Sequence, residues 1–418
     1  MLRKVIAVSV VLPWLAAACG GGPQTRSIRV DYGSDEFAAA FLDYFPKNVS
    51  IRQGDTVEFH QTWTGEPHTV TMGTKADEYG GLIEKGGYFK AFAEKGYEGL
   101  PPEPPKEIKP LDDALPAMFA RPDYERVAQN GAQPCYLTSG LPPTNADKPC
   151  TKAQQKQPEF TGRQSYYNSG YIHYAGAGGN TFRVKIADNA KTGRYFFYCN
   201  NHGPFMSGWL TIKTKDAKIP SQEEVNKVAL QEVRKPLNPL LKEYRAAQQK
   251  RSPVPDDVVA DVKAARLPTV AEGGKTYYTG RWSGFGAEHV DTAFGLEFTP
   301  KTSTAKVGEK ITWLSVGGHT ISFDVPKYFP IFTVNKDGTV VRNSKLDPPA
   351  GGAPKLPEDK DGVLTADGGT YDGTGFWSSG LFGADKFAVY SLRISKPGTY
   401  KYACLVHPAM VGRITITP

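Results

Sequence analysis

The chain has 418 residues, with a formal net charge of +7, 39% hydrophobic residues and 22% charged residues. This length suffices for about two or three domains, and the balance indicates a soluble globular body. The basic residues are interspersed with acids and form no cluster with interleaved aromatics, so a nucleic-acid-binding protein is not expected. The 44 glycines, 33 prolines, 21 tyrosines and 21 phenylalanines favour many short strands joined by turns over a helical bundle.

The N-terminus has the pattern of a targeting segment. A basic start and an apolar stretch over 5–15, too short to span a bilayer, precede three alanines that form a small-residue cleavage site. Cys19 follows directly, which resembles the bacterial lipoprotein signal, in which this cysteine is lipidated. We therefore expect a signal peptide over 1–18, a tether over 19–26 and an extracytoplasmic protein anchored to the membrane, in the periplasm or at the cell surface. Ordinary secretion is the alternative.

The rest of the chain contains a diverged internal repeat. Each copy opens with two alternating strands around a turn of glycine and an acidic residue, at 54–55 and at 308–309. Each continues with a histidine in another alternating strand, His68 or His319. Each closes with an aromatic strand that ends in a cysteine, a short loop and a last strand. Two such copies predict two β-rich domains.

These patterns divide the chain into three parts. We assign the first domain to 27–215 and the second to 271–418. An insertion interrupts each domain, at 73–165 in the first and at 335–375 in the second, and we expect long loops there, over one end of each domain. Residues 216–270 form the connector between the domains.

The connector has a helical composition, rich in glutamate, lysine, glutamine, leucine and alanine. Ser221 followed by Glu224 fits a helix-capping box. Pro236 and Pro239 are expected to break the helix that starts there, because proline lacks the backbone donor. Residues 256–266 are expected to form a further short helix.

Two of the five cysteines lie together in the first insertion. Cys135 and Cys150 are close in sequence, in a turn-rich segment. In an oxidising compartment we interpret them as one disulfide closing a short loop, which would stabilise the fold by about 3 kcal/mol in the chain-entropy model. Two unrelated free thiols are the alternative.

Two further cysteines begin loops with metal-binding chemistry. The loops read Cys-x2-His-x3-Met in the first copy and Cys-x2-His-x2-Met in the second. Two imidazoles and a thiolate, with a weak axial thioether, suit copper that cycles between two oxidation states, whereas a thioether is a poor ligand for zinc, the main competitor. The second imidazole must come from a distant strand. The complete sets are His68, Cys199, His202 and Met206, and His319, Cys404, His407 and Met410.

Both loops and their flanking strands resemble the plastocyanin/azurin-type cupredoxins, and the second loop is similar to that of amicyanin. The resemblance implies an all-β fold: two Greek-key cupredoxin β-sandwiches joined by the helical connector. It also implies two copper ions, one per domain, each with equatorial His, Cys and His and an axial Met. A polar side chain after the strand histidine should hydrogen-bond the backbone near the cysteine, as Thr69 and Thr320 would. The resemblance covers 45–72 with 166–213, and 275–334 with 376–418.

The resemblance implies a type 1 (blue) copper electron-transfer protein. The loop histidine of this family reaches the surface through an apolar patch, here 203–205 and 408–409, where a redox partner such as a cytochrome or a copper oxidoreductase would dock. Copper storage or delivery is the alternative, although such proteins usually use Met-rich tracts and only five methionines are present. A binding or structural module carried by the insertions is a third hypothesis.

Enzymatic copper chemistry is less favoured. The sequence has no His-x-His motif of the kind that feeds a trinuclear cluster. Copper nitrite reductases have a histidine directly before the loop cysteine, where this chain has Tyr198 and Ala403. The spare histidines His60, His173 and His289 are expected to be surface or structural residues. A copper-dependent oxidoreductase subunit would require the fold or a subunit interface to gather them.

Overall fold

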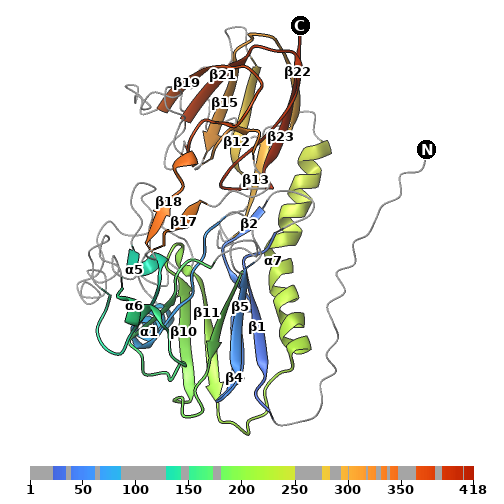
Figure 1. Ribbon diagram of the computed structural model, residues 1–418. Coiled ribbons are helices and arrows are strands. Elements are labelled where there is room, and N and C mark those ends of the chain that lie inside the picture. Colours follow the sequence, from blue (N-terminus) through green and yellow to red (C-terminus); the bar gives the residue numbers. More distant parts are fainter. Residues whose placement is uncertain are drawn as a thin grey trace.

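The fold is all-β, as predicted, with two sandwiches arranged end to end (Figure 1). Among the described residues, no helix is long and apolar enough to cross a membrane. The predicted leader, Cys19, the helix over 256–266, His173 and His289 lie outside the described residues. The computed structural model describes residues 22–33, 39–61, 66–85, 129–142, 150–172, 180–249, 275–282, 293–299, 301–316, 319–325, 331–336, 339–346, 364–381, 388–407 and 409–418.

The first sandwich combines a four-stranded and a six-stranded sheet. The pairs β1–β5 and β4–β11 are parallel, and the other pairs are antiparallel. The smaller sheet has the order β3 (Tyr44–Phe45), β1 (Thr25–Val30), β5 (Thr56–Gln61) and β9 (Thr181–Lys185). The larger has the order β4 (Asn48–Arg52), β11 (Gly203–Lys213), β10 (Gly193–Cys199), β6 (Thr71–Met72), β8 (Tyr166–Ser169) and β7 (Pro134–Leu137).

The second sandwich repeats this pairing. Parallel β12–β15 corresponds to β1–β5, and parallel β14–β23 to β4–β11. One sheet has the order β19 (Leu364–Tyr371), β21 (Ala388–Ile394), β15 (Ile311–Val316), β12 (Lys275–Trp282), β13 (Ala293–Thr299) and β2 (Ala39–Phe41). The other has the order β14 (Thr302–Lys306), β23 (Val411–Thr417), β22 (Gly398–Ala403), β16 (Ser322–Phe323) and β20 (Trp377–Ser378).

Alternating burial explains why these segments become strands. In β5, Val57, Phe59 and Gln61 are buried while the residues between them are more exposed. Phe59 meets Tyr44 and Phe197 edge to face inside the first sandwich. Burying a phenylalanine of this kind is worth about 2–3 kcal/mol relative to leaving it in water.

The glycine turns link opposite sheets rather than the two strands of a hairpin. Gly54 and Gly308 have φ of +82° and +71°. This region favours glycine, because in other residues the Cβ comes too close to the backbone carbonyl oxygen. The strand before each turn lies in one sheet of its sandwich and the strand after it lies in the other. The predicted strands are therefore present in both copies, and each turn carries the chain across the core.

The two sandwiches are joined by backbone pairing and by the connector helix. Strand β2 leaves the first domain and pairs antiparallel with β13 of the second. Helix α7 (Gln222–Gln249) lies beside both sandwiches (Figure 1) and contacts β1, β3 and β13. Its buried Val233 and Leu240 cluster with Phe41 and Phe45. The position of one domain on the other therefore depends on a shared sheet and on a helix that contacts both sandwiches.

The predicted start of α7 is confirmed, but the predicted break is wrong. The Glu224 backbone N–H donates to Ser221 Oγ at 3.2 Å, and the Ser221 N–H donates to the Glu224 carboxylate at 2.7 Å. Pro236 and Pro239 lie inside a continuous helix. Proline removes hydrogen bonds within a helix, but burial of the apolar face of α7 against the first domain and β13 offsets that loss.

The first insertion is more structured than the predicted loops. It contains α1 (Thr74–Lys85), the short helices α5 (Gln129–Ala132) and α6 (Lys152–Gln155), and β7, which extends the larger sheet. Ala76 and Tyr79 of α1 pack against Phe196 and Tyr198. The helix thus covers the outer face of β10, the strand that leads to the first loop cysteine.

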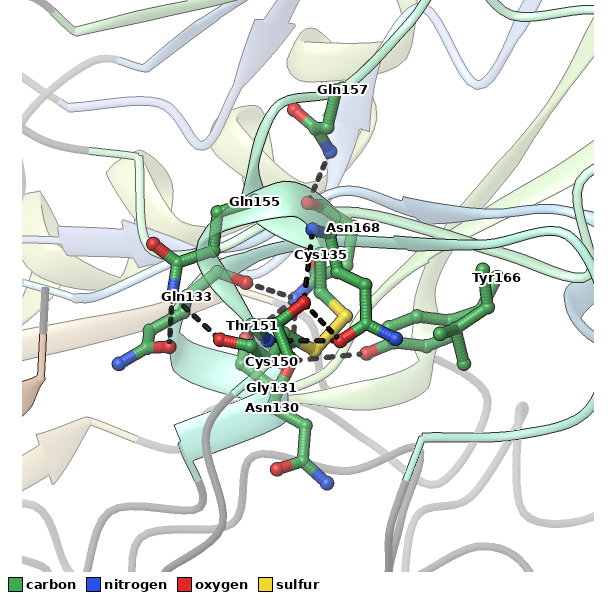
Figure 2. Close-up of a disulfide and its surroundings, with 12 residues drawn as sticks. Asn130, Gly131, Gln133, Cys135, Cys150, Thr151, Gln155, Gln157, Tyr166 and Asn168 are labelled. Carbon is green, nitrogen blue, oxygen red and sulfur yellow. Dashed lines mark hydrogen bonds between the residues drawn. A yellow bond between two sulfur atoms is a disulfide. The ribbon is translucent and has the colours of Figure 1, made fainter.

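The predicted disulfide between Cys135 and Cys150 is present, with Cα atoms 5.9 Å apart. Figure 2 shows the polar side chains around it. The Asn168 side-chain amide donates to the carbonyls of Gly131 and Gln133 at 2.9 and 3.0 Å. The bridge fastens β7 to the segment that begins α6, and the Asn168 bonds fasten α5 to β8.

The second insertion also differs from the predicted loops. Strand β19 lies inside the assigned range 335–375, yet it pairs in parallel with β21 as part of the second sandwich. A hairpin of β17 (Phe332–Val334) and β18 (Val340–Arg342) precedes a 3-10 turn, Ser344–Leu346. This hairpin touches the first domain: the rings of Phe332 and Tyr171 stack at 4.7 Å, and Gln129 hydrogen-bonds the backbone of Val340.

Candidate metal centres

The first candidate centre brings together His68, Cys199 and His202. Cys199 ends β10, His202 lies in the loop before β11, and His68 lies just before β6, which pairs with β10. The Nδ1 atoms of the two histidines are 3.1 Å apart, and the Cys199 sulfur is 3.6 Å from His202 Nδ1. His68 and Cys199 are fully buried. Side chains more than a hundred positions apart therefore meet, as the sequence predicted.

The second centre has the same arrangement in the second sandwich. His319 Nδ1 lies 3.2 Å from His407 Nδ1, and the Cys404 sulfur lies 3.8 and 3.5 Å from these two atoms. All three residues are buried. In each centre the three donor atoms lie within 4.8 Å of one another.

The donor chemistry of both groups fits a copper ion. Two imidazole nitrogens and a sulfur converge in each, which is the trigonal donor set that such copper sites use. Burial alone would raise the pKa of the Cys199 and Cys404 thiols, but the adjacent imidazoles outweigh it and hold both pKa values well below the usual range. The metal-binding thiolate is therefore the favoured form at both sites.

The threonine after each strand histidine makes the expected hydrogen bond. Thr69 Oγ1 accepts the backbone N–H that follows Cys199 at 2.7 Å, and Thr320 Oγ1 accepts the one that follows Cys404 at 2.8 Å. The backbone N–H of each threonine also points at the cysteine sulfur, at 3.3 and 3.4 Å. Each thiolate is thus held by the chain itself, in a buried setting where hydrogen bonds to charged groups are strong.

The two loop methionines are fully buried next to these groups. Met410 closes the second loop through its backbone, which accepts from Cys404 N at 3.0 Å and donates to the His407 carbonyl at 2.8 Å. Met206 lies in β11, adjacent to the residue that pairs with Tyr198. Their assignment as axial ligands stays a prediction.

Asp31, which no sequence motif indicated, supports the first centre. Its Oδ2 lies 2.9 Å from His68 Nε2, and both side chains have 0% exposure. The other oxygen accepts the Phe41 backbone N–H at 2.7 Å. Burial lowers the pKa of His68, but hydrogen bonds with Asp31 and Cys199 outweigh it and leave that pKa raised. Among the described residues, His319 has no corresponding carboxylate.

Glu66, which no motif indicated either, lies between the two centres. Its Oε1 is 2.8 Å from His407 Nε2 and its Oε2 is 3.6 Å from His202 Nε2. Burial lowers the pKa of each loop histidine, but the neighbouring thiolate and Glu66 outweigh it and raise both pKa values to about 10. Burial would raise the pKa of Glu66, yet its bonds to the two imidazoles hold it well below the usual range. The loop histidines, expected to meet a partner at the surface, face each other across one carboxylate.

His60, the one spare histidine among the described residues, is exposed, as expected. Its Nδ1 lies 3.1 Å from Thr181 Oγ1 and its Nε2 lies 3.2 Å from the Asn180 amide. Strand β5 directs it away from both centres, so it has the structural surface role that was predicted for it.

No protein-family model matches the chain, and no curated protein matches it. Solved structures do match it, each over part of the chain. A purple cupredoxin from Nitrosopumilus maritimus is 15% identical over 34% of this chain and 99% of its own, with a TM-score of 0.17. Amicyanin from Paracoccus versutus is 13% identical over 37% of this chain and 88% of its own, with a TM-score of 0.17. Plastocyanin from Dryopteris crassirhizoma is 18% identical over 30% of this chain and 91% of its own, with a TM-score of 0.15. At these identities and scores, function has to be argued from the geometry of the two centres.

Proposed function

We propose that this protein is an extracytoplasmic electron carrier with two type 1 copper centres. The observation that supports this most is the repeated buried set of two imidazole nitrogens and one cysteine sulfur. This donor set suits copper that alternates between two oxidation states. The proposed ligands are His68, Cys199 and His202 with axial Met206, and His319, Cys404 and His407 with axial Met410.

The surrounding residues favour transfer of an electron with little rearrangement. Bound copper supplies the one-electron couple. The thiolates accept backbone N–H groups, and the loops are tied to Thr69 and Thr320, so the donor atoms are held by contacts that do not depend on the ion. Fixed outer contacts of this kind orient ligands and tune a metal centre.

The proposed location outside the cytoplasm agrees with the Cys135–Cys150 bridge, since disulfides persist in oxidising compartments. Membrane attachment through a lipid on Cys19 and exchange with a cytochrome or a copper oxidoreductase belong to the same proposal. The intact mass of the mature protein tests the lipid directly, because lipidation adds the mass of the acyl chains and plain secretion does not.

The experiment for the function combines copper quantification with visible and electron-spin-resonance spectra. We expect two copper ions per chain with intense thiolate charge-transfer absorption in the wild type. Cys199→Ser and Cys404→Ser should each abolish the band of one centre and leave the other. His60→Ala, at an exposed histidine away from both groups, is the matched control and should change neither band.

Two outcomes would redirect the proposal. Copper that binds without the charge-transfer band, and that passes readily to a chelator, would favour storage or delivery over electron transfer. A preference for zinc over copper at both sites would contradict a redox role altogether.

A further inference from the structure

The two centres face each other through the outer nitrogens of their loop histidines. In His202 and in His407, Nδ1 points at the cysteine sulfur of its own centre, at 3.6 and 3.5 Å. The opposite ring nitrogen, Nε2, lies 2.8 Å from Glu66 in His407 and 3.6 Å from it in His202, where the Asn201 side-chain amide is closer, at 3.0 Å. From one sulfur to the other, the path through two imidazoles and one carboxylate contains no gap between residues longer than 3.6 Å.

We propose that Glu66 couples the two copper centres, so that they form one internal electron-exchange unit instead of two separate surface carriers. This inference rests on the proposed function. The exchange is a one-electron step: the centre that begins reduced becomes oxidised and the other becomes reduced. No bond forms or breaks, and no proton leaves Glu66.

Burial supports a role for this path inside the protein. The exposed fractions of the side chains are 19% for Glu66, 11% for His202 and 7% for His407. The partly buried carboxylate of Glu66 is stabilised by its two imidazole partners. The faces of the loop histidines that would otherwise meet an external partner are occupied by the path itself.

Holding the domains together does not require Glu66. Strand β2 already pairs with β13 over Ala39–Phe41, and Tyr171 stacks on Phe332. Gln129 adds two hydrogen bonds to Val340 across the same interface, at 2.7 and 2.9 Å. The two sandwiches should therefore keep their relative position when Glu66 is replaced, which makes its role in coupling separable from a role in folding.

Glu66→Gln is the decisive variant, because it keeps the size of the side chain. Its single amide oxygen can accept from one histidine, while the amide nitrogen cannot accept from the other. Glu58→Gln is the matched control: Glu58 has 21% exposure and pairs with Arg183, away from both centres.

The first measurement uses the copper-free protein. We expect the Nε2–H resonance of His407, 2.8 Å from Glu66, to be shielded from exchange with water in the wild type and in Glu58→Gln. In Glu66→Gln this resonance and the ring signals of His202 should both shift. Unshifted ring signals in Glu66→Gln would overturn the bridge, whether or not the protein binds copper.

The second measurement follows internal exchange in the copper-loaded protein. One centre is reduced by pulse radiolysis, and redistribution is read from the two charge-transfer bands, assigned with Cys199→Ser and Cys404→Ser. We expect Glu66→Gln to keep both coppers and both bands but to exchange at least about tenfold more slowly, equivalent to about 1.4 kcal/mol in the barrier. Full copper content with an unchanged exchange rate would overturn the coupling and leave the proposed function intact. Absence of both bands in the wild type would instead refute the function.

Discussion

Asp31→Asn should raise the reduction potential of the first centre alone. Asp31 Oδ2 lies 2.9 Å from His68 Nε2, where neither side chain reaches water. Asparagine is close to isosteric, and it tolerates the backbone φ of +63° at this position. Its amide oxygen can still accept the Phe41 N–H that Asp31 accepts at 2.7 Å. The substitution therefore removes one negative charge and one acceptor beside His68 while the backbone stays in place.

The size of the shift follows from the role of the carboxylate. A buried anion on a metal-ligating imidazole makes that ligand more basic, and losing such a partner typically costs about 10–100-fold in metal affinity. The more highly charged cupric ion should bear most of this loss. For a one-electron couple each tenfold change is about 59 mV, so the potential of the first centre should rise by about 60–120 mV.

Voltammetry on single-centre proteins isolates this effect. In a Cys404→Ser background only the first centre responds, and Asp31→Asn should shift it upward. In a Cys199→Ser background the same substitution should leave the potential of the second centre unchanged, since Asp31 contacts His68 and not His319. An unchanged or lower potential at the first centre would refute the assigned role of the carboxylate.

Three further predictions concern the support of the centres and the fold. Thr320→Val removes the hydroxyl that accepts the buried Leu405 N–H at 2.8 Å. The free energy of unfolding of the copper-free protein in urea should therefore fall by about 1–3 kcal/mol, and an unchanged value would contradict the contact. In α1, Gly80→Ala places a Cβ 2.6 Å from the Phe196 ring and should destabilise the protein. Gly81→Ala places a Cβ with nothing within 4 Å and should stabilise the protein by up to about 1 kcal/mol. Equal effects of the two variants on thermal unfolding would argue against this packing. Burial raises the pKa of Asp77 from 3.8 to about 7, so its charged form opposes folding and stability is lost as the pH rises between these values. The free energy of unfolding of the wild type should therefore decrease relative to that of Asp77→Asn from about pH 4 to about pH 8, and a constant difference would rule this out.

The sequence was most informative where function depends on local spacing. Each loop supplies a cysteine, a histidine and a methionine within a few residues, and the repeat marks His68 and His319 as equivalent. Pairing of β6 with β10, and of β16 with β22, then brings each strand histidine to its loop. The His-Cys-His groups could therefore be predicted without knowing how the two domains pack.

The supporting carboxylates could not be predicted in this way. Asp31 follows β1, and nothing in its sequence context indicates a histidine partner. Glu66 is close to His68 in sequence, but its shorter contact is to His407, 341 positions away. That contact exists only because β2, α7 and the insertions set one sandwich on the other.

The predicted secondary structure was wrong where tertiary packing outweighs local conformational preference. Pro236 and Pro239 remain helical because α7 packs along both domains. Strand β19 has the sequence LTADGGTY, whose paired glycines and aspartate are typical of a turn, yet its pairing with β21 makes it an edge strand. In both cases the energy that decides the structure comes from residues far away in the chain.

The central claim is that each sandwich holds one copper ion through two imidazoles and a thiolate. X-ray absorption at the copper edge, on protein carrying a measured amount of copper, tests it most directly. We expect two coppers per chain, each with one sulfur at short distance and two imidazole nitrogens, and loss of half of the copper–sulfur signal in Cys404→Ser. Copper surrounded only by nitrogen and oxygen, or a sulfur signal that survives both cysteine substitutions, would contradict it.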